Sequence, residues 1–341
     1  MSEGTAAQAF QEVPVISIAA LVTPDPEPEE LRKTVEQIGQ ACRDVGFFYI
    51  KDHGVTAEDS AAMFRASREF FALPLEEKMK IRLGITEQFR GFVPLGGEVT
   101  GGKTDWHECL DLQPRSGRNA DTIAAAAAAR SRDDHPLDDP GQWPPALPSF
   151  RETVMRAWDQ LYGLSARISA GMALSLGLDE HFFAPYHGDE LSDLRMVHYP
   201  PYNEAIGSTA PEALSMDEVD HGFGAHVDYG FLAVLQQDEV GGLEVRNAEG
   251  DWIPAPHIPG TFLVNIGQMM QRWTNDRYRA TWHRVQLPGA VDRYSIPFFF
   301  EPRYGAVIEP LDVCCDADNP PRYEPVQFGP YVVDLFSKAY D

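Results

Sequence analysis

The chain has 341 residues, of which 43% are hydrophobic and 23% are charged, a composition typical of globular proteins. This composition excludes a wholly disordered chain, and no repeat supports a collagen-like or coiled-coil structure. The 52 acidic residues outnumber the 28 basic ones, which gives a net charge of −24. An acidic surface repels phosphate backbones and anionic lipids, so we expect neither nucleic acid nor a membrane as a partner.

Cysteine usage and the N-terminus point to a reducing environment. The four cysteines form no CxxC pair, so neither a disulfide framework nor a zinc ribbon is predicted. The apolar stretch 13–22 is short and contains Pro14 and Ser17. It fits neither a signal peptide nor a membrane span, and we therefore expect a cytoplasmic protein.

The first half of the chain is predicted to be mostly helical. The expected elements are a strand within 13–22, a helix over 28–45, a strand over 47–51, a helix over 57–71 and a long helix over 150–176. Residues 80–148 lack clear periodicity, and we expect a long excursion with a mobile piece near 115–140. Together these elements predict an α/β cap over 1–190.

The second half is rich in short β runs separated by turn residues. These runs lie at 194–199, 231–236, 243–246, 261–266, 281–287 and 293–300. Many short strands with regular turns predict a sandwich or barrel, here over 191–303. A C-terminal extension over 304–341 is expected to end in a helix at 329–340. We expect the chemistry where the barrel opens.

A candidate metal site lies in the segment 224–230. Alternate residues of a strand face the same side, so His226 and Asp228 are expected to lie side by side. The third ligand has to come from another strand, and His283 lies in such an apolar run. Two histidines and one carboxylate on one face leave positions open for a co-substrate and O2, as in non-haem Fe(II) sites.

A structural role is the alternative interpretation of these histidines. One His-x-Asp pair is a weak signal, and His283 alone would more often be a core histidine. The three residues together favour the metal site. His221, His198 and His107 are weaker candidates for ligands. His53 lies in a predicted turn and is interpreted as structural.

A candidate anion site follows the last of these histidines. Arg293 and Ser295 share one face of the predicted strand at 293–300. A buried guanidinium without a partner is costly, so an anionic ligand, such as a carboxylate held by the fork and the hydroxyl, is the natural occupant. Tyr199 can add a phenol donor to the same carboxylate. The alternative is an arginine reaching solvent at a barrel rim.

The chain resembles the iron- and 2-oxoglutarate-dependent dioxygenases of the isopenicillin N synthase-like class over nearly its whole length. The N-terminal matches are Pro14-Val15-Ile16, Gly46-Phe47-Phe48-Tyr49-Ile50, Asp52-His53-Gly54-Val55, Phe70-Phe71-Ala72-Leu73-Pro74, Glu77-Lys78 and Arg90-Gly91-Phe92. The matches in the β half are the His-x-Asp pair, the distal histidine, the Arg-x-Ser pair and Asn265-Ile266-Gly267. Two positions depart from the pattern, with Val197 in place of an asparagine and Gln268 in place of an aspartate.

The resemblance implies a mixed α and β fold with a double-stranded β-helix, or jelly-roll, core. It implies Fe(II) ligands at His226, Asp228 and His283, with 2-oxoglutarate and O2 as co-substrates. Arg293, Ser295 and Tyr199 match the residues that hold the distal carboxylate of 2-oxoglutarate. The implied activity is oxidation, typically hydroxylation, of an unactivated C–H bond of a small molecule, with release of succinate and CO2.

Three alternatives stay open at this point. An oxidase of the isopenicillin N synthase type would work without 2-oxoglutarate, although it carries the same Arg-x-Ser pair. The segments 97–103 and 105–108 resemble those of ethylene-forming enzymes. A non-catalytic barrel is disfavoured because all three ligands are present.

The substrate pocket is the least specified part of the sequence. Candidate wall residues are Arg90, Phe92, Glu98, Arg195, Phe231, Met270 and Phe298. Each apolar one can equally be a core residue. We expect a small soluble substrate that enters between the cap and the barrel, and Glu98 would favour a cationic group if it faces the pocket. The sequence predicts no oligomeric state.

Overall fold

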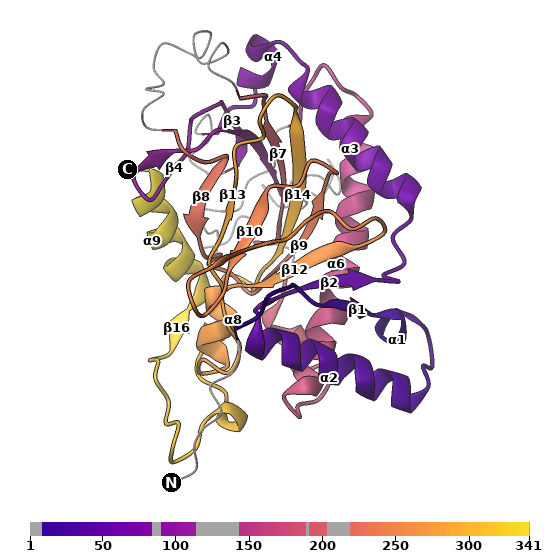
Figure 1. The fold of residues 1–341 in the computed structure, drawn as a ribbon, viewed down its shortest axis with the longest axis vertical. Helices are drawn as coiled ribbons and strands as arrows, with labels where there is room; N and C mark the ends of the chain where they lie inside the picture. The colour runs from indigo at the N-terminus through magenta and orange to yellow at the C-terminus, as the bar shows by residue number, and fades with distance from the viewer. Residues whose placement is uncertain (1–8, 84–89, 114–142, 189–190, 203–218, 341) are drawn as a thin grey trace, which may run out of the picture.

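The computed structural model describes residues 9–83, 90–113, 143–188, 191–202 and 219–340. Its centre is an eight-stranded sheet (Figure 1) with the order β1-β2-β12-β9-β14-β7-β6-β3. Its strands are β1 (Val15–Ser17), β2 (Phe47–Lys51), β3 (Gly91–Val93), β6 (Glu108–Leu112), β7 (Asp193–Tyr199), β9 (Leu232–Gln237), β12 (Phe262–Ile266) and β14 (Arg293–Phe300). All neighbouring pairs are antiparallel except β1 with β2.

A second sheet of four strands has the order β11-β10-β13-β8. Its strands are β8 (Phe223–His226), β10 (Leu243–Arg246), β11 (Trp252–Pro254) and β13 (His283–Val285). The two sheets pack together as the predicted jelly roll, and Figure 1 shows the strands of both between the C-terminal helix on the left and the long helices on the right. Two-strand ribbons, β4 (Val99–Thr100) with β5 (Lys103–Thr104) and β15 (Val307–Ile308) with β16 (Val326–Gln327), lie outside these sheets.

The helices are α1 (Ala19–Val22), α2 (Pro28–Asp44), α3 (Ala57–Phe71), α4 (Leu75–Met79), α6 (Phe150–Ser175), α8 (Gln268–Trp273) and α9 (Phe328–Tyr340). Three of the helices, α2, α3 and α6, pack against strands of the eight-stranded sheet. The Thr56 side chain caps α3 by accepting a hydrogen bond from the Asp59 amide. After α2 the chain turns through Gly46, at a φ of 76°. A Cβ there would overlap the Arg279 carbonyl, so only glycine fits.

The eight-stranded sheet separates two hydrophobic cores, because successive side chains of a strand face opposite sides. On β14, Ile296, Phe298 and Phe300 belong to the larger core beneath the helices. Arg293 and Ser295 face the other way, toward the second sheet, where a smaller core includes Tyr199. The chemistry-bearing side chains therefore lie between the sheets.

The predicted elements agree closely with the structure for most of the chain. The predicted helices at 57–71 and 150–176 correspond to α3 and α6, and the strands at 47–51 and 243–246 correspond to β2 and β10. One expectation was wrong, because residues 19–22 form the short helix α1 rather than the end of a strand. The expected mobile piece near 115–140 falls within 114–142, outside the described residues.

The segment 80–148 holds more regular structure than its lack of periodicity indicated. Strands β3 and β6 continue the main sheet beyond β7. Both are buried on each face, so neither shows the alternation of polar and apolar residues that identifies a half-exposed strand. The predicted segment 1–190 thus adds strands to both edges of the sheet whose centre comes from 191–303.

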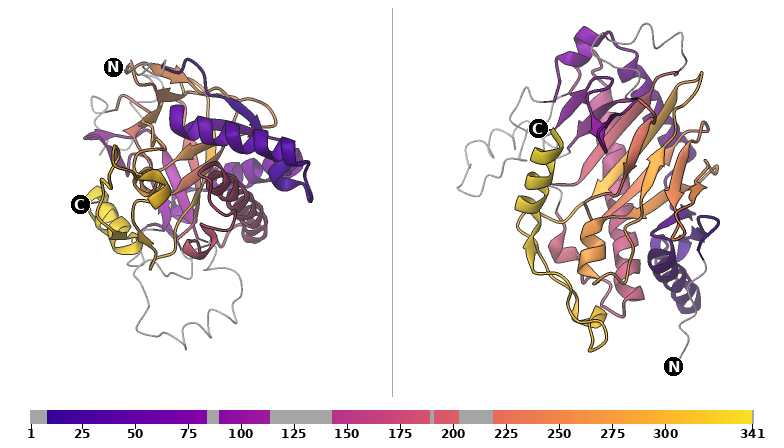
Figure 2. Two further views of the ribbon diagram at one scale, coloured as in Figure 1. Left: turned by 90° about the horizontal axis from the view of Figure 1, so that it is seen from below. Right: turned by 60° about the vertical axis from the view of Figure 1, so that its left-hand side comes forward.

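The C-terminal segment runs back along the open side of the sheets. Figure 1 and Figure 2 place α9 beside β4 and β8, far from the N-terminus. In the described part of the chain, no helix combines the length and apolar character needed to cross a bilayer.

Candidate metal centre and adjoining cavity

Two side chains of the second sheet and one from the loop that follows β8 converge at one point. His226 ends β8, His283 begins β13, and the two residues are paired in register. Asp228 Oδ1 lies 3.4 Å from His226 Nε2 and 3.6 Å from His283 Nε2. One ligand atom from each residue lies within 4.8 Å of the others, which is close enough for all three to bind one metal ion.

Backbone carbonyls orient both imidazoles. His226 Nδ1 lies 2.8 Å from the Gly224 carbonyl oxygen, and His283 Nδ1 lies 3.2 Å from that of Thr281. A proton on each Nδ1 leaves the lone pair of Nε2 free for a metal. Asn265 Nδ2 donates to Asp228 Oδ2 over 2.5 Å, which turns Oδ1 toward the histidines.

The protonation states of Asp228 and His283 suit metal binding. Burial raises the pKa of Asp228, but His283 and His226 outweigh it, and the pKa falls well below its usual range. Burial lowers the pKa of His283 to about 4, so this imidazole is neutral at pH 7. A carboxylate and a neutral imidazole are the protonation states in which these side chains bind Fe(II). For His226, burial lowers the pKa, but the neighbouring Asp228 outweighs it and the pKa lies above its usual value, so a metal has to displace that proton.

The secondary structure at Asp228 differs from the sequence prediction. Strand β8 ends at His226, so Asp228 lies in the following loop and not on the same strand. Its position is held by backbone pairing, because the Gln268 amide donates to the Asp228 carbonyl over 2.8 Å.

The candidate anion site has the predicted composition. Arg293 and Ser295 lie on the inner face of β14, and Arg293 is opposite Tyr199 on β7. The Arg293 side chain is 1% exposed and its guanidinium lies 4.5 Å from the centre of the Tyr199 ring. Its Nε donates to the Gly241 carbonyl and its Nη1 to Ser295 Oγ. No carboxylate in the described residues pairs with it, so the site fits an anionic ligand.

A cavity of about 380 Å³ adjoins two of the three candidate ligands, His226 and Asp228. His226 and Asp228 form one wall, and strands β7 and β14 form another. Phe328 and Val332 of α9 close a third side. The volume suits a small molecule.

Three of the seven predicted wall residues line this cavity, namely Arg90, Glu98 and Arg195. The other four, Phe92, Phe231, Met270 and Phe298, are fully buried in the larger core and do not line it. Phe298 does not line the cavity because alternate residues of β14 face opposite sides of the sheet. Its ring centre lies 5.6 Å from that of Trp158 on α6. Its neighbour Phe299 faces the cavity instead.

Sequence reasoning missed the acidic side chains of the cavity. Asp111, Asp193 and Glu301 line it together with Glu98. The sequence carried a signal for Asp193, which lies two residues before Arg195 and therefore on the same face of β7. Glu301 lies just beyond the end of β14.

Glu98 lines the cavity, but both of its carboxylate oxygens already have partners within the protein. Arg195 Nη2 lies 2.5 Å from its Oε1, and His107 Nε2 lies 2.8 Å from its Oε2. Arg195 also binds Asp111 through Nε and Nη2, at 2.7 Å and 3.2 Å. Burial raises the pKa of Glu98, but Arg195 and His107 lower it by more than burial raises it. The pKa of Glu98 therefore lies well below its usual range.

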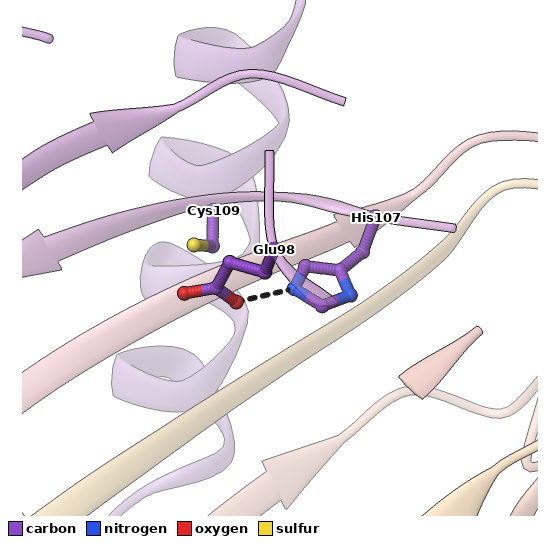
Figure 3. A group of neighbouring side chains, drawn as sticks. All are labelled: Glu98, His107 and Cys109. Carbon is purple, nitrogen blue, oxygen red and sulfur yellow. Dashed lines mark hydrogen bonds and ion pairs between the residues drawn. The ribbon is translucent and has the colours of Figure 1, made fainter. Parts of the chain in front are cut away.

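A second group of metal-capable side chains lies here, formed by Glu98, His107 and Cys109. Figure 3 shows the Glu98 carboxylate hydrogen-bonded to the His107 ring, with the Cys109 side chain on the Glu98 side of the pair. His107 Nδ1 is also occupied, by the Gly222 carbonyl at 2.9 Å. Burial raises the pKa of Cys109 well above its ordinary value, so the thiol is protonated. The group is therefore a hydrogen-bonded network that fixes Glu98.

The remaining histidines named above have structural partners. His198 bridges Glu108 and Asp292 on the outer face of β7. His221 contacts Asp220 and Arg284 at the surface. His53 accepts a hydrogen bond from the Val55 amide and stacks on Phe262, with ring centres 4.0 Å apart.

Two family models match the chain in succession. Residues 13–146 match the N-terminal region of the non-haem dioxygenases in morphine synthesis, and residues 192–302 match the 2OG-Fe(II) oxygenase superfamily. The chain is 34% identical to a homoarginine-6-hydroxylase from Oryza sativa subsp. japonica, across 95% of this chain and 96% of the relative. It is 33% identical to a 2-oxoglutarate-Fe(II) type oxidoreductase from Emericella nidulans, across 90% and 85%.

Solved structures have the same fold. A full-length Neurospora crassa protein in complex with alpha-KG and thymine has a TM-score of 0.78 and 26% identity, across 96% of this chain and 97% of that one. A complex of JOX2 with 2OG, Fe and JA has a TM-score of 0.70 and 27% identity, across 95% and 84%. The chain belongs to the 2-oxoglutarate- and Fe(II)-dependent oxygenase superfamily. It is an oxidoreductase that uses Fe(II), 2-oxoglutarate and O2.

Proposed function

We propose that His226, Asp228 and His283 hold the Fe(II) of this oxygenase. The donor set supports this, with two imidazole Nε2 atoms and one carboxylate oxygen within reach of one ion. We further propose that Arg293 and Ser295 bind the C5 carboxylate of 2-oxoglutarate, with Tyr199 beside them. The buried guanidinium without a carboxylate partner in the described residues supports this assignment.

When bound, Fe(II) with 2-oxoglutarate and O2 supplies an oxidant that breaks an unactivated C–H bond, with release of succinate and CO2. The protein's own part is to position the substrate and to exclude water. Phe299, Phe328 and Val332 supply apolar lining to the cavity. The charged side chains of the same lining orient the substrate.

We propose that the substrate is a small molecule with a cationic group, and that the reaction is a hydroxylation. The observation that carries this is the acidic lining, in which four carboxylates face the cavity beside the candidate iron ligands. A guanidinium or ammonium group would balance them. The rice relative named homoarginine-6-hydroxylase supports a guanidinium-bearing amino acid.

A matched panel of small molecules tests this proposal. The Fe(II)-loaded protein is given 2-oxoglutarate with basic, neutral or acidic amino acids, and succinate release is measured for each. We expect stimulation by basic members, with one hydroxylated product per succinate. Full product formation without any 2-oxoacid would identify the oxidase alternative, and headspace ethylene would identify the ethylene-forming one.

The Glu98→Gln variant is expected to reduce the preference for cationic over neutral substrates by a few-fold. The effect is modest because Glu98 already shares its charge with Arg195 and His107. The measurement is the ratio of kcat/KM for a basic amino acid and its uncharged analogue. An unchanged ratio would remove Glu98 from substrate recognition.

We also propose a cytoplasmic location. All four cysteines, Cys42, Cys109, Cys314 and Cys315, are free thiols, as a reducing compartment allows. Cell fractionation with an antibody against the chain tests this, and recovery from an oxidising compartment would refute it.

A further inference from the structure

The fixed charges of the cavity do not balance. Besides the candidate ligand Asp228, the described lining residues carry four carboxylates and two guanidinium groups. The carboxylates are Glu98, Asp111, Asp193 and Glu301, and the guanidinium groups are Arg90 and Arg195. Arg195 is shared by Glu98 and Asp111, which leaves Arg90 for the remaining two. Asp193 and Glu301 are therefore the carboxyl groups that cationic side chains compensate least, and burial raises the pKa of both.

Glu301 follows the last residue of β14 and reaches the cavity through a gap in the facing loop. The gap exists because residue 230 is glycine, and a Cβ there would overlap the Glu301 carboxylate. Glu301 Oε2 accepts a hydrogen bond from the Phe231 amide at 3.1 Å. No cationic side chain of the described residues forms an ion pair with it. Burial raises the pKa of Glu301 well above its ordinary value, the sign of a carboxylate that lacks compensation.

Asp193 lies at the same end of the sheet and on the same face. It pairs with Phe299 across β7 and β14, two residues before Glu301, and the Ser192 hydroxyl accepts a hydrogen bond from the Glu301 amide at 3.2 Å. Asp193 Oδ1 lies 3.4 Å from Arg90 Nε. That oxygen is buried and has no hydrogen-bond partner in the described part of the chain. It can therefore accept a donor from a ligand.

We propose that Glu301, with Asp193 beside it, is the subsite for the cationic group of the substrate. This rests on the proposed function, and it assigns the contact to a different carboxylate from Glu98. A guanidinium suits the subsite because its planar fork can donate to two carboxylates at once. Glu98 is a poorer acceptor because Arg195 and His107 already occupy both of its oxygens.

The test compares binding of two probes of the same shape. The probes are L-homoarginine, which carries a guanidinium, and L-homocitrulline, which carries an uncharged ureido group. Each is titrated calorimetrically into the full chain loaded with Mn(II) and 2-oxoglutarate, so that binding is measured without turnover. The variants are Glu301→Gln and Asp193→Asn, and the control is Glu249→Gln at an exposed position.

We expect Glu301→Gln to weaken homoarginine binding by about tenfold to a hundredfold, the range for a hydrogen bond to a charged group. Homocitrulline binding is expected to change less than about twofold on the same scale. Asp193→Asn should act in the same direction with a smaller effect, and it keeps the test valid if Glu301→Gln does not fold. Glu249→Gln should bind both probes as the wild type does.

Three outcomes overturn the proposal. The folded Glu301→Gln and Asp193→Asn variants bind homoarginine like the wild type, or both probes lose affinity equally, or the wild type binds neither probe. The proposed function is tested separately by succinate formation from 2-oxoglutarate in the Fe(II)-loaded wild type. If succinate forms while the probe results are negative, only the subsite is wrong. If no succinate forms with any substrate, the proposed function itself fails.

Discussion

Replacing Asp228 with alanine is expected to abolish turnover and to remove most of the bound iron. The change deletes the single carboxylate of the candidate centre and leaves two imidazoles, which hold Fe(II) poorly. The fold should survive, because Asp228 lies in a loop after β8 and its backbone hydrogen bond from Gln268 is unaffected. Iron content per chain and succinate release measure the two effects, and circular dichroism checks the fold.

Three histidine variants accompany this experiment. His226→Ala and His283→Ala remove the other two candidate ligands and should behave like Asp228→Ala, whereas His181→Ala is the control. His181→Ala, at a side chain that is 79% exposed, should retain full iron and full rate. A His283→Ala protein with wild-type iron occupancy and rate would show that the ligand assignment is wrong.

The Arg293→Leu variant is expected to raise the apparent constant for 2-oxoglutarate by about a hundredfold or more. Breaking a buried ion pair by removing one partner costs about 3–5 kcal/mol, and every 1.4 kcal/mol is a tenfold change in affinity. Arg293 is 1% exposed, so water cannot replace the lost contact cheaply. The measurement is succinate release against 2-oxoglutarate concentration at a saturating level of the prime substrate.

Arg65→Leu is the control for this variant, because Arg65 is exposed on α3 and does not line the cavity. It should leave the 2-oxoglutarate constant unchanged. Ser295→Ala should raise the constant by less than Arg293→Leu does, since it removes a neutral hydrogen bond and no charge. An Arg293→Leu protein with the wild-type constant would place the co-substrate elsewhere.

The elements that the sequence predicted well carry their own local signals. Helices α3 and α6 show the 3.6-residue spacing of apolar side chains, and β14 shows the alternation of a strand. Strands β3 and β6 have no such signal, since every residue in them is buried. Their place beside β7 depends on pairing with distant residues, which a pattern within the strand does not reveal.

The proximity of the three candidate metal ligands could be predicted from the sequence, although Asp228 reaches the site in a way that strand alternation does not describe. His226 and His283 do lie on paired strands. Asp228 reaches the same point from a loop, where its direction is set by contacts with Asn265 and Gln268 rather than by strand alternation. The spacing of two residues therefore predicted that Asp228 lies near His226, although Asp228 lies in a loop and not on the expected strand.

The pocket was predicted less well because burial in the core and exposure to a cavity look alike in sequence. Phe298 and Phe299 are chemically identical, and only the parity set by Arg293 assigns them to opposite faces. Glu301 lies outside the last strand, and its role depends on the space left by Gly230, a contact across 71 residues of chain. No local pattern predicts such a contact.

Strand β14 begins at Arg293, the proposed ligand of the 2-oxoglutarate C5 carboxylate, and Glu301 follows its last residue. At about 3.3 Å per residue, these two points are roughly 26 Å apart along one continuous backbone. If Glu301 binds the cationic group of the substrate, that group has a fixed position in the cavity. The carbon that is oxidised is then selected by its distance from the cationic group. In a homologous series of basic amino acids, the new hydroxyl should keep its distance from the guanidinium and change its number counted from the α-carboxyl.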